Sequence, residues 1–149
     1  MHVQVVTAII EREDRRILIG QRRKGDSSPL KWEFPGGKVK TGESDEQALA
    51  REIREELGVT LVRCVPVSRV EQEYGPGDSF SVTFFAASIL ESELHPGPFE
   101  QVQWVLPREL GDYDFLSANR RLVAELATGR IKPAEILAAH DSASPPESH

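Results

Sequence analysis

Cysteine is nearly absent from the 149-residue sequence, and the single Cys64 excludes both an intrachain disulfide and a metal site built from several cysteines. The four histidines are scattered, without the spacing of a zinc site, at His2, His95, His140 and His149. No apolar run approaches the roughly 20 residues that a membrane-spanning helix needs, and the N-terminus lacks a signal-peptide pattern. We therefore expect a reduced, cytoplasmic protein with no membrane partner.

Acidic residues outnumber basic ones, 24 to 18, so the formal net charge is -6. That balance argues against a broad basic surface for duplex nucleic acid, so no nucleic-acid partner is expected. A small anionic ligand remains compatible with it, because local basic residues or a bound metal can offset the charge. The length predicts one domain that is large enough to bury a core.

Hydrophobic periodicity and turn residues divide the chain into strands and helices. Strands are expected at 3–10, 17–23, 60–74, 78–90 and 102–107, with a loop at 24–31 and a tight turn at Gly75-Pro76-Gly77. Helices are expected at 45–57 and 117–129, with a further turn or two at 133–140. The polar, proline-rich stretch 141–149 predicts a disordered tail behind a single domain at 1–140.

Local signals mark the ends of both longer helices. Ser44 is an N-cap that forms a capping box with Gln47, and Gly58 ends that helix. Ser117 is the expected N-cap of the second helix, and Gly129 closes it.

The helix expected at 45–57 places Glu52, Glu55 and Glu56 on one side, beside an apolar stripe that would anchor it to a sheet. Like charges at this spacing destabilise an isolated helix by about 0.2–0.5 kcal/mol per pair. Arg51 can relieve part of the repulsion by pairing with Glu55. Acidic faces are common on soluble helices, so a solvated surface and a metal site both remain open at this point.

The preceding Pro35-Gly36-Gly37 favours the metal site, because glycines let the backbone turn sharply and bring a carbonyl close to a ligand. A carbonyl together with several carboxylates is the hard oxygen environment that Mg²⁺ prefers. Magnesium in such sites keeps some waters and bridges to phosphates. The pattern therefore predicts a phosphorylated substrate.

Residues 37–59 read GKVKTGESDEQALAREIREELGV. This segment resembles the Nudix box, G-x5-E-x7-R-E-U-x-E-E-x-G-U with U a bulky aliphatic residue, in every defined position. The resemblance implies the Nudix fold: an α/β architecture with a mixed β-sheet sandwiched between α-helices (α/β/α), in which the box forms a loop, a helix and a second loop.

The resemblance also implies a cofactor, Mg²⁺ or Mn²⁺, and its ligands. Glu52, Glu55 and Glu56 would hold the metal, with the Gly36 carbonyl as a further ligand. Nudix enzymes often recruit one more acid from a loop after the box, and Glu100 is the candidate here. The alternative for Glu100 is an ordinary loop acid that faces solvent.

Catalytic roles follow from the same resemblance. Glu52 is the expected general base for the attacking water, and Arg51 would orient the glutamates by pairing with them. Glu43 would support the loop and a metal-bound water. A bound metal acidifies water and neutralises phosphate charge, which is the electrostatic centre of this chemistry.

The flanking stretches LKWEFPGGKV, ILIGQRR and LSANRRLVAEL resemble the MutT-like branch and its CTP pyrophosphohydrolase relatives. That resemblance implies that Arg22 and Asn119 contact the base, that Phe34 walls its pocket and that Gly37 lies beside the nucleotide. An Asn amide suits a purine edge because it offers a donor and an acceptor together. The alternatives are a solvated strand end for Arg22 and a helix cap for Asn119, although Ser117 would already supply the cap.

The expected function is Mg²⁺-dependent hydrolysis of a nucleoside triphosphate, with 8-oxo-dGTP as substrate and nucleotide-pool sanitation as the result. CTP or dCTP is an alternative substrate. Tyr74 and Pro76 leave ADP-ribose or a dinucleoside polyphosphate open, although a hairpin turn explains Pro76 without any ligand. A nucleotide sensor without activity would predict lost box glutamates, and none is missing. Removal of pyrophosphate from RNA 5′ ends would call for more basic surface. The expected partner is a small-molecule nucleotide, and the chain is expected to be a monomer or a homodimer.

Overall fold

β-Branched residues at the start of the chain form the centre of a mixed sheet. In the computed structural model, which describes residues 1–90, 94–95 and 97–143, β1 (His2–Ile10) is parallel to β6 (Asp78–Ile89) and antiparallel to β4 (Gly36–Lys38). The outer strand β5 (Leu61–Gly75) pairs with β6, which gives the order β4-β1-β6-β5. The predicted hairpin is confirmed, with Gly77 at a φ of 78° in its turn.

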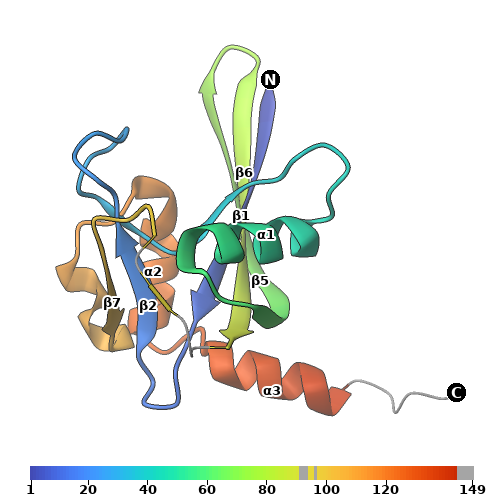
Figure 1. Cartoon of the computed structure of the whole chain (residues 1–149), viewed down its shortest axis with the longest axis vertical. Coiled ribbons are helices and arrows are strands. Elements are labelled where there is room, and N and C mark those ends of the chain that lie inside the picture. Colours follow the sequence, from blue (N-terminus) through green and yellow to red (C-terminus); the bar gives the residue numbers. More distant parts are fainter. Residues whose placement is uncertain (91–93, 96, 144–149) are drawn as a thin grey trace, which may run out of the picture.

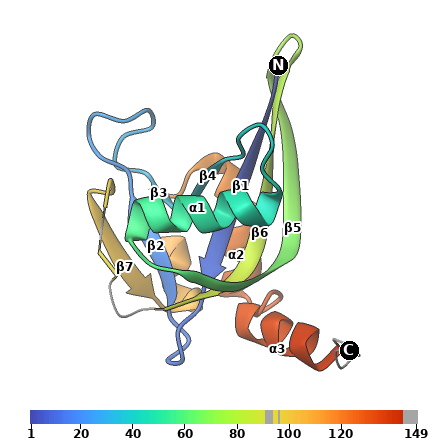
Figure 2. The same cartoon turned by 45° about the vertical axis from the view of Figure 1, so that its right-hand side comes forward.

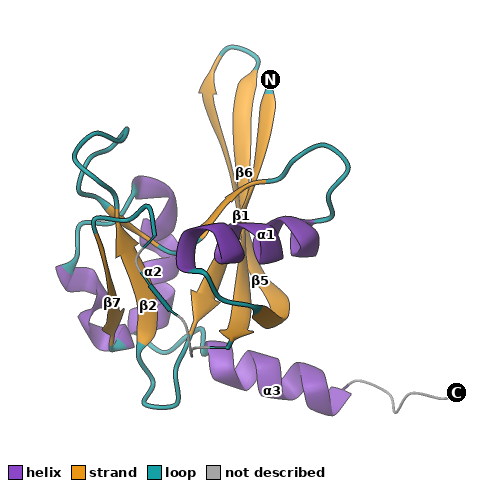
Figure 3. Ribbon diagram, in the orientation of Figure 1, coloured by secondary structure: helices purple, strands orange, loops and turns teal. Residues whose placement is uncertain are grey.

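A second, antiparallel sheet lies beside the first and has the order β3-β2-β7. It consists of β2 (Ile17–Gln21), β3 (Trp32–Glu33) and β7 (Gln101–Val105). Figure 3 shows β2 and β7 as a group separate from the long β1, β5 and β6 strands. The cavity described below is lined by residues of both sheets.

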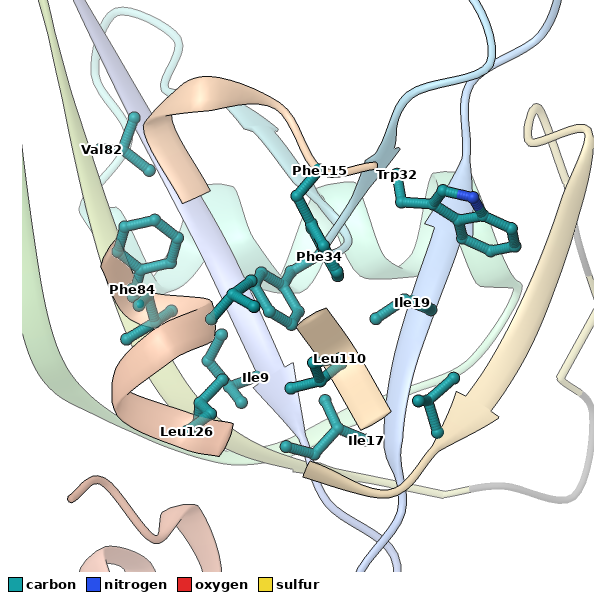
Figure 4. Close-up of a cluster of buried hydrophobic side chains, with 13 residues drawn as sticks. Ile9, Ile17, Ile19, Trp32, Phe34, Val82, Phe84, Leu110, Phe115 and Leu126 are labelled. Atoms are coloured by element: carbon teal, nitrogen blue, oxygen red, sulfur yellow. The ribbon is translucent and has the colours of Figure 1, made fainter. Parts of the chain in front are cut away.

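Helices cover opposite faces of the mixed sheet because β1 and β6 send alternate side chains to two separate cores. Val6 and Phe85 pack in one buried cluster with the apolar stripe of α1 (Asp45–Leu57). Ile9 and Phe84 pack in the other, which includes the buried side chains of α2 (Arg120–Ala127). Figure 2 shows α1 across the front of the strands and α2 behind them, and Figure 4 shows the second cluster. The predicted α/β/α arrangement is confirmed.

Helix α1 begins and ends where the sequence indicates. The Ser44 hydroxyl accepts from the Gln47 amide, and the Gln47 side chain accepts from the Ser44 amide, so the capping box is complete. Gly58 adopts a left-handed φ of 70°, and its amide donates to the Arg54 carbonyl at 2.9 Å. These local interactions fix the helix that carries the three glutamates.

The second helix starts later than predicted, and the expected cap at Ser117 is wrong. A 3-10 turn occupies Ser117–Asn119, and α2 begins at Arg120 without a side-chain cap. The reason is that the Asn119 amide donates to the Leu116 carbonyl at 2.9 Å. This backbone hydrogen bond forms a tighter 3-10 turn in place of a serine side-chain cap.

Two strand ends also differ from the sequence prediction. β2 ends at Gln21 rather than at residue 23, because the Arg22 amide donates to the Lys31 carbonyl and the chain turns away. β7 ends at Val105, and a 3-10 helix at Pro107–Asp112 follows, since Pro107 has no amide to continue a ladder. The short strands β3 and β4 were not predicted, because their pairing depends on distant partners.

The C-terminal helix α3 (Pro133–Ala143) packs against β5 and β6 and is longer than the expected turn or two (Figure 1). It continues past the expected start of the tail at residue 141, while residues 144–149 lie outside the described part of the chain. No helix within the described ranges is both long and apolar enough to cross a bilayer.

A buried carboxylate at the end of β1 caps α3. The Glu11 side chain is 3% exposed, pairs with Arg15 at 3.3 Å and accepts from the Ala134 amide at 2.8 Å. A negative charge at a helix N-terminus satisfies a free amide and suits the helix dipole. Glu11 therefore links the C-terminal helix to the sheet.

We expect Glu11→Ala to lower the free energy of unfolding by about 1–2 kcal/mol, because the Ala134 amide loses its acceptor. Glu11→Gln, which keeps an acceptor oxygen, should cost less. Urea denaturation measures both variants against Glu13→Ala, an exposed acid in the same turn that should change stability by less than about 0.5 kcal/mol. Equal stability of Glu11→Ala and Glu13→Ala would contradict the capping role.

Candidate active site

Two adjacent glycines bring the edge of the mixed sheet against helix α1. Gly36 pairs with Thr7 and Gly37 pairs with Val6 across β4 and β1. A Cβ added at Gly36 would overlap the Val6 carbonyl, whereas one added at Gly37 would overlap the Glu52 carboxylate. The lack of side chains at these positions therefore allows the helix carboxylates to approach the backbone closely.

Glu56 lies at the centre of this contact. Its carboxylate accepts from the Gly36 amide at 2.8 Å. Burial raises the pKa of Glu56 to about 8, the Gly36 amide opposes this rise, and the negative charges of Glu33, Glu52 and Glu55 add to it. The carboxyl is therefore buried among like charges, and a cation bound there would stabilise its ionised form.

Arg51 ties the other acids of the box together. Its guanidinium forms two hydrogen bonds to Glu43, at 2.6 and 2.9 Å, and one to Glu52 at 2.8 Å. The expected contact with Glu55 is present at 3.3 Å, and a further bond reaches the Lys38 carbonyl. These bonds raise the pKa of Arg51 and hold the pKa of Glu43 at about 2. The arginine thus positions Glu52 directly and anchors the preceding loop through Glu43.

Donor chemistry and charge at this site fit a hard divalent cation. Glu56 has a carboxylate oxygen at the Gly36 backbone, Glu52 lies over Gly37, and Glu55 is close enough for its charge to act on Glu56. Carboxylate oxygens of this kind suit Mg²⁺ or Mn²⁺. Among the described residues, no three acidic, histidine or cysteine side chains yet converge into a closed ligand group. Arg51 donates to Glu52 and Glu55, and the Gly36 amide donates to Glu56.

A cavity of about 620 Å³ opens beside Glu56, and the residues expected to bind the nucleotide line it. Its lining includes Arg22, Phe34, Gly36, Gly37 and Asn119. The structure thus brings together, in one cavity, side chains that are far apart in the sequence. Glu52 adjoins this group through Gly37.

Phe34 and Asn119 form the inner part of this cavity. Phe34 is 1% exposed, stacks on Phe115 with ring centres 5.2 Å apart and meets Phe84 edge to face (Figure 4). Asn119 is 6% exposed, and its side-chain amide has no hydrogen bond with any other described residue. A nearly buried amide without partners is available to a ligand.

Arg22 is held in place, which argues against the solvated strand end. Its guanidinium donates to the Ser27 carbonyl at 2.7 Å, to the Ser27 hydroxyl at 2.9 Å and to Glu33 at 3.1 Å. These bonds fix the loop at 24–31 over one side of the cavity and leave donors of the guanidinium free for a ligand.

Glu33 is a site residue that sequence analysis missed. It lines the cavity, and burial raises its pKa while the neighbouring Arg22 lowers it. The available signal was an acid placed between two buried aromatic residues, Trp32 and Phe34. Other missed lining residues come from β6 and from the turn before β7: Phe80, Val82, Pro98 and Phe99.

Glu100 is not brought to the glutamates. The residue is exposed and does not line the cavity, and its amide donates to the Gln21 carbonyl at 2.8 Å. This position favours the solvent-facing alternative over a role as metal ligand.

Gly36 and Gly37 should respond differently to the same substitution. In Gly37→Ala the new methyl group displaces the flexible Glu52 carboxylate, so we expect Mn²⁺ affinity to fall at least about tenfold while the fold survives. In Gly36→Ala the new methyl group meets the Val6 carbonyl instead, so the free energy of unfolding should fall. Calorimetric Mn²⁺ titration and urea denaturation separate the effects. Unchanged Mn²⁺ affinity in Gly37→Ala would contradict the assigned contact.

Comparison with known proteins agrees with this geometry. The family described as NUDIX domain matches residues 1–126. The 8-oxo-dGTP diphosphatase of Escherichia coli is 32% identical over 124 residues, which cover 83% of this chain and 95% of that protein. The CTP pyrophosphohydrolase of the same organism is 34% identical over 134 residues, covering 89% and 98%.

Similarity also extends to solved structures. The solution structure of the E. coli ORF135 protein superposes with a TM-score of 0.73 at 31% identity and covers 87% of this chain and 91% of that one. The glutamate helix, the glycine pair and the two-sheet core thus occur in a sequence and a fold that match one family. The chain belongs to the NUDIX domain family.

Proposed function

We propose that this hydrolase cleaves a nucleoside triphosphate to the monophosphate and pyrophosphate, with Mg²⁺ or Mn²⁺ as cofactor and 8-oxo-dGTP as its principal substrate. The observation that carries the proposal is the cavity that contains both the Glu56 carboxylate and the Asn119 amide, which has no hydrogen bond to the side chains and backbone that the structure describes. One end offers a donor and an acceptor for a base edge, and the other offers oxygen ligands for a cation beside phosphates. The named activity of the 8-oxo-dGTP diphosphatase relative supports the choice of base.

The metal would be held by Glu52, Glu55 and Glu56, with the carbonyl oxygen of Gly36 as a further ligand. When bound, it supplies positive charge against the phosphate oxygens and makes water more acidic. Burial raises the pKa of Glu56 to about 8, so a bound cation would favour its charged form at neutral pH.

Glu52 would act as the general base. Arg51 holds its carboxylate at 2.8 Å, beside the glycine that borders the cavity. A water oxygen forms the new bond to phosphorus, its proton passes to Glu52, and the bond between phosphorus and the bridging oxygen breaks to release the two products. Glu43 anchors Arg51 and so keeps Glu52 in this position.

The nucleotide would enter with its base between Phe34 and Asn119. Phe34 cannot move far, because Phe115 and Phe84 pack on it. Arg22 closes the side of the cavity through its bonds to Ser27 and Glu33. Such a fixed pocket favours a base whose edge satisfies the Asn119 amide.

A pyrimidine triphosphate is the second candidate substrate. The relative named CTP pyrophosphohydrolase covers more of this chain than the diphosphatase does, and an Asn amide can also pair with a cytosine edge. One contact supports ADP-ribose or a dinucleoside polyphosphate as substrate. Tyr74 is 54% exposed, and its ring centre lies 5.8 Å from that of Phe80, which lines the cavity. The working partner in each case is a free nucleotide of the cytoplasm, and the protein would act as a monomer or a homodimer.

Substrate choice can be measured by comparing kcat/KM with Mg²⁺ for 8-oxo-dGTP, dGTP, CTP, dCTP, ADP-ribose and a diadenosine polyphosphate. We expect kcat/KM for 8-oxo-dGTP to exceed that for dGTP by about a hundredfold or more, because the site would recognise the edge of the base. Asn119→Ala should reduce this ratio by about tenfold or more, since the amide then no longer distinguishes the two bases.

Arg121→Ala is the matched control, because Arg121 lies two residues further along and its side chain is 85% exposed. It should keep the wild-type ratio. A best rate on CTP or dCTP would replace the purine assignment, and an equal loss for every base in Asn119→Ala would remove the base-reading role of that residue. A best rate on ADP-ribose or the dinucleotide would assign Tyr74 to the site.

A further inference from the structure

The segment Gly97–Glu100 connects the metal-binding helix to the end of β2. Gly97 has a φ of 53°, and a Cβ added there would overlap the carbonyl of Glu56. The segment therefore rests directly on the backbone of the residue whose carboxylate lies at the centre of the site. No side chain fits between them.

The other end of this segment is fixed to the second sheet. The Glu100 amide donates to the Gln21 carbonyl at 2.8 Å. The Phe99 ring is 5% exposed and lies over Gly20, where an added Cβ would come within 2.6 Å of it. Between these two attachments, Pro98 and Phe99 line the nucleotide cavity together with Glu56.

Arg23 joins the segment to the strand end that also carries Arg22. Its guanidinium donates to the Gly97 carbonyl at 3.0 Å and to the Phe99 carbonyl at 3.4 Å. The Arg23 amide is held in turn by the Asp26 carboxylate at 3.0 Å. One side chain therefore binds two backbone carbonyls on either side of Pro98, and the planar guanidinium suits this arrangement.

We propose that Arg23 is a positioning residue for nucleotide binding, which acts by holding the Gly97–Phe99 wall of the cavity against helix α1. This inference rests on the proposed function, because it concerns the same cavity. It adds a residue that contacts neither the metal ligands nor the expected base. Arg23 shapes the site from outside, through the backbone of the wall.

The position of the wall predicts which kinetic constant changes. Pro98 and Phe99 border the nucleotide in the ground state and the transition state alike, so a displaced wall weakens binding equally in both. Such a loss raises KM and leaves kcat nearly unchanged. A disturbance of Glu56 itself would instead lower kcat, and Gly97→Ala should do so because its methyl group meets the Glu56 carbonyl.

The test compares Arg23→Ala, Arg23→Lys and Gly97→Ala with wild type in steady-state hydrolysis of dGTP and 8-oxo-dGTP. We expect Arg23→Ala to raise KM about tenfold, as for the loss of one or two hydrogen bonds, with kcat within about twofold. Arg23→Lys should recover part of the loss, since one ammonium can reach a single carbonyl. Gly97→Ala should lower kcat by about tenfold or more.

Arg108→Ala is the control, because Arg108 is an exposed arginine on the 3-10 helix after β7 and does not line this cavity. It should keep both constants at the wild-type values. Thermal unfolding of each variant shows whether the fold is retained, which we expect because Phe99 stays packed in the core. If Arg23→Ala does not fold, the KM of the folded Arg23→Lys decides the question.

An unchanged KM in folded Arg23→Ala would overturn the inference, and so would a loss confined to kcat. If Arg23→Ala does not fold, an unchanged KM in Arg23→Lys would also overturn the inference. Absence of nucleotide hydrolysis by the wild-type protein would instead contradict the proposed function. The two failures are thus distinguishable.

Discussion

No side chain fits at Gly36 or Gly37, which lie between strand β1 and the Glu52 carboxylate of helix α1, and this constraint shapes the active site. Gly36 and Gly37 occupy the gap, so the Gly36 amide reaches the Glu56 carboxylate at 2.8 Å while Glu52 lies over Gly37. A larger residue at Gly37 would turn the Glu52 carboxylate aside, whereas one at Gly36 would press against the Val6 carbonyl of β1. The approach of backbone to carboxylate therefore depends on two residues that contribute no side chain at all.

The close approach of α1 to the sheet also buries the Glu56 carboxyl near other acids, and a bound cation would neutralise their charge. Glu56 is buried beside three other acids, and its pKa is raised to about 8 in consequence. Arg51 compensates the outer acids, Glu43, Glu52 and Glu55, but its bonds do not extend to Glu56. Capping and apolar packing keep α1 in place despite this repulsion, with Ser44 and Gly58 at its ends and Ile53 in the core. Stability of the helix and function of the site thus come from different faces of one element.

The parts of this structure that local rules govern could be predicted from the sequence. The ends of α1 follow from Ser44, Gln47 and Gly58, and the hairpin follows from Gly75-Pro76-Gly77. Resemblance to a family predicted that Arg22, Phe34 and Asn119 would share a cavity, which no local rule could show.

Features that depend on distant contacts were not predictable in this way. The strand β4 exists because β1 offers it an edge, and the 3-10 start before α2 replaces a serine cap that the sequence favoured. Glu33 enters the site only because β3 folds beside Arg22, and Glu100 lies outside the cavity because its backbone is bound to Gln21. Each of these outcomes is set by tertiary packing rather than by neighbours in the sequence.

The most direct test of the account is the number of protons released when Mn²⁺ binds, obtained calorimetrically in buffers of different ionisation enthalpy. A pKa of about 8 leaves Glu56 mostly protonated at pH 7, because the folded protein without metal favours the neutral carboxyl. Binding of the cation should then release about one proton at pH 7 and almost none at pH 9, and affinity should increase as the pH rises toward 8. Glu56→Gln should abolish the release. Binding at pH 7 without proton release, or with the same release in Glu56→Gln, would contradict the central role of this buried carboxyl.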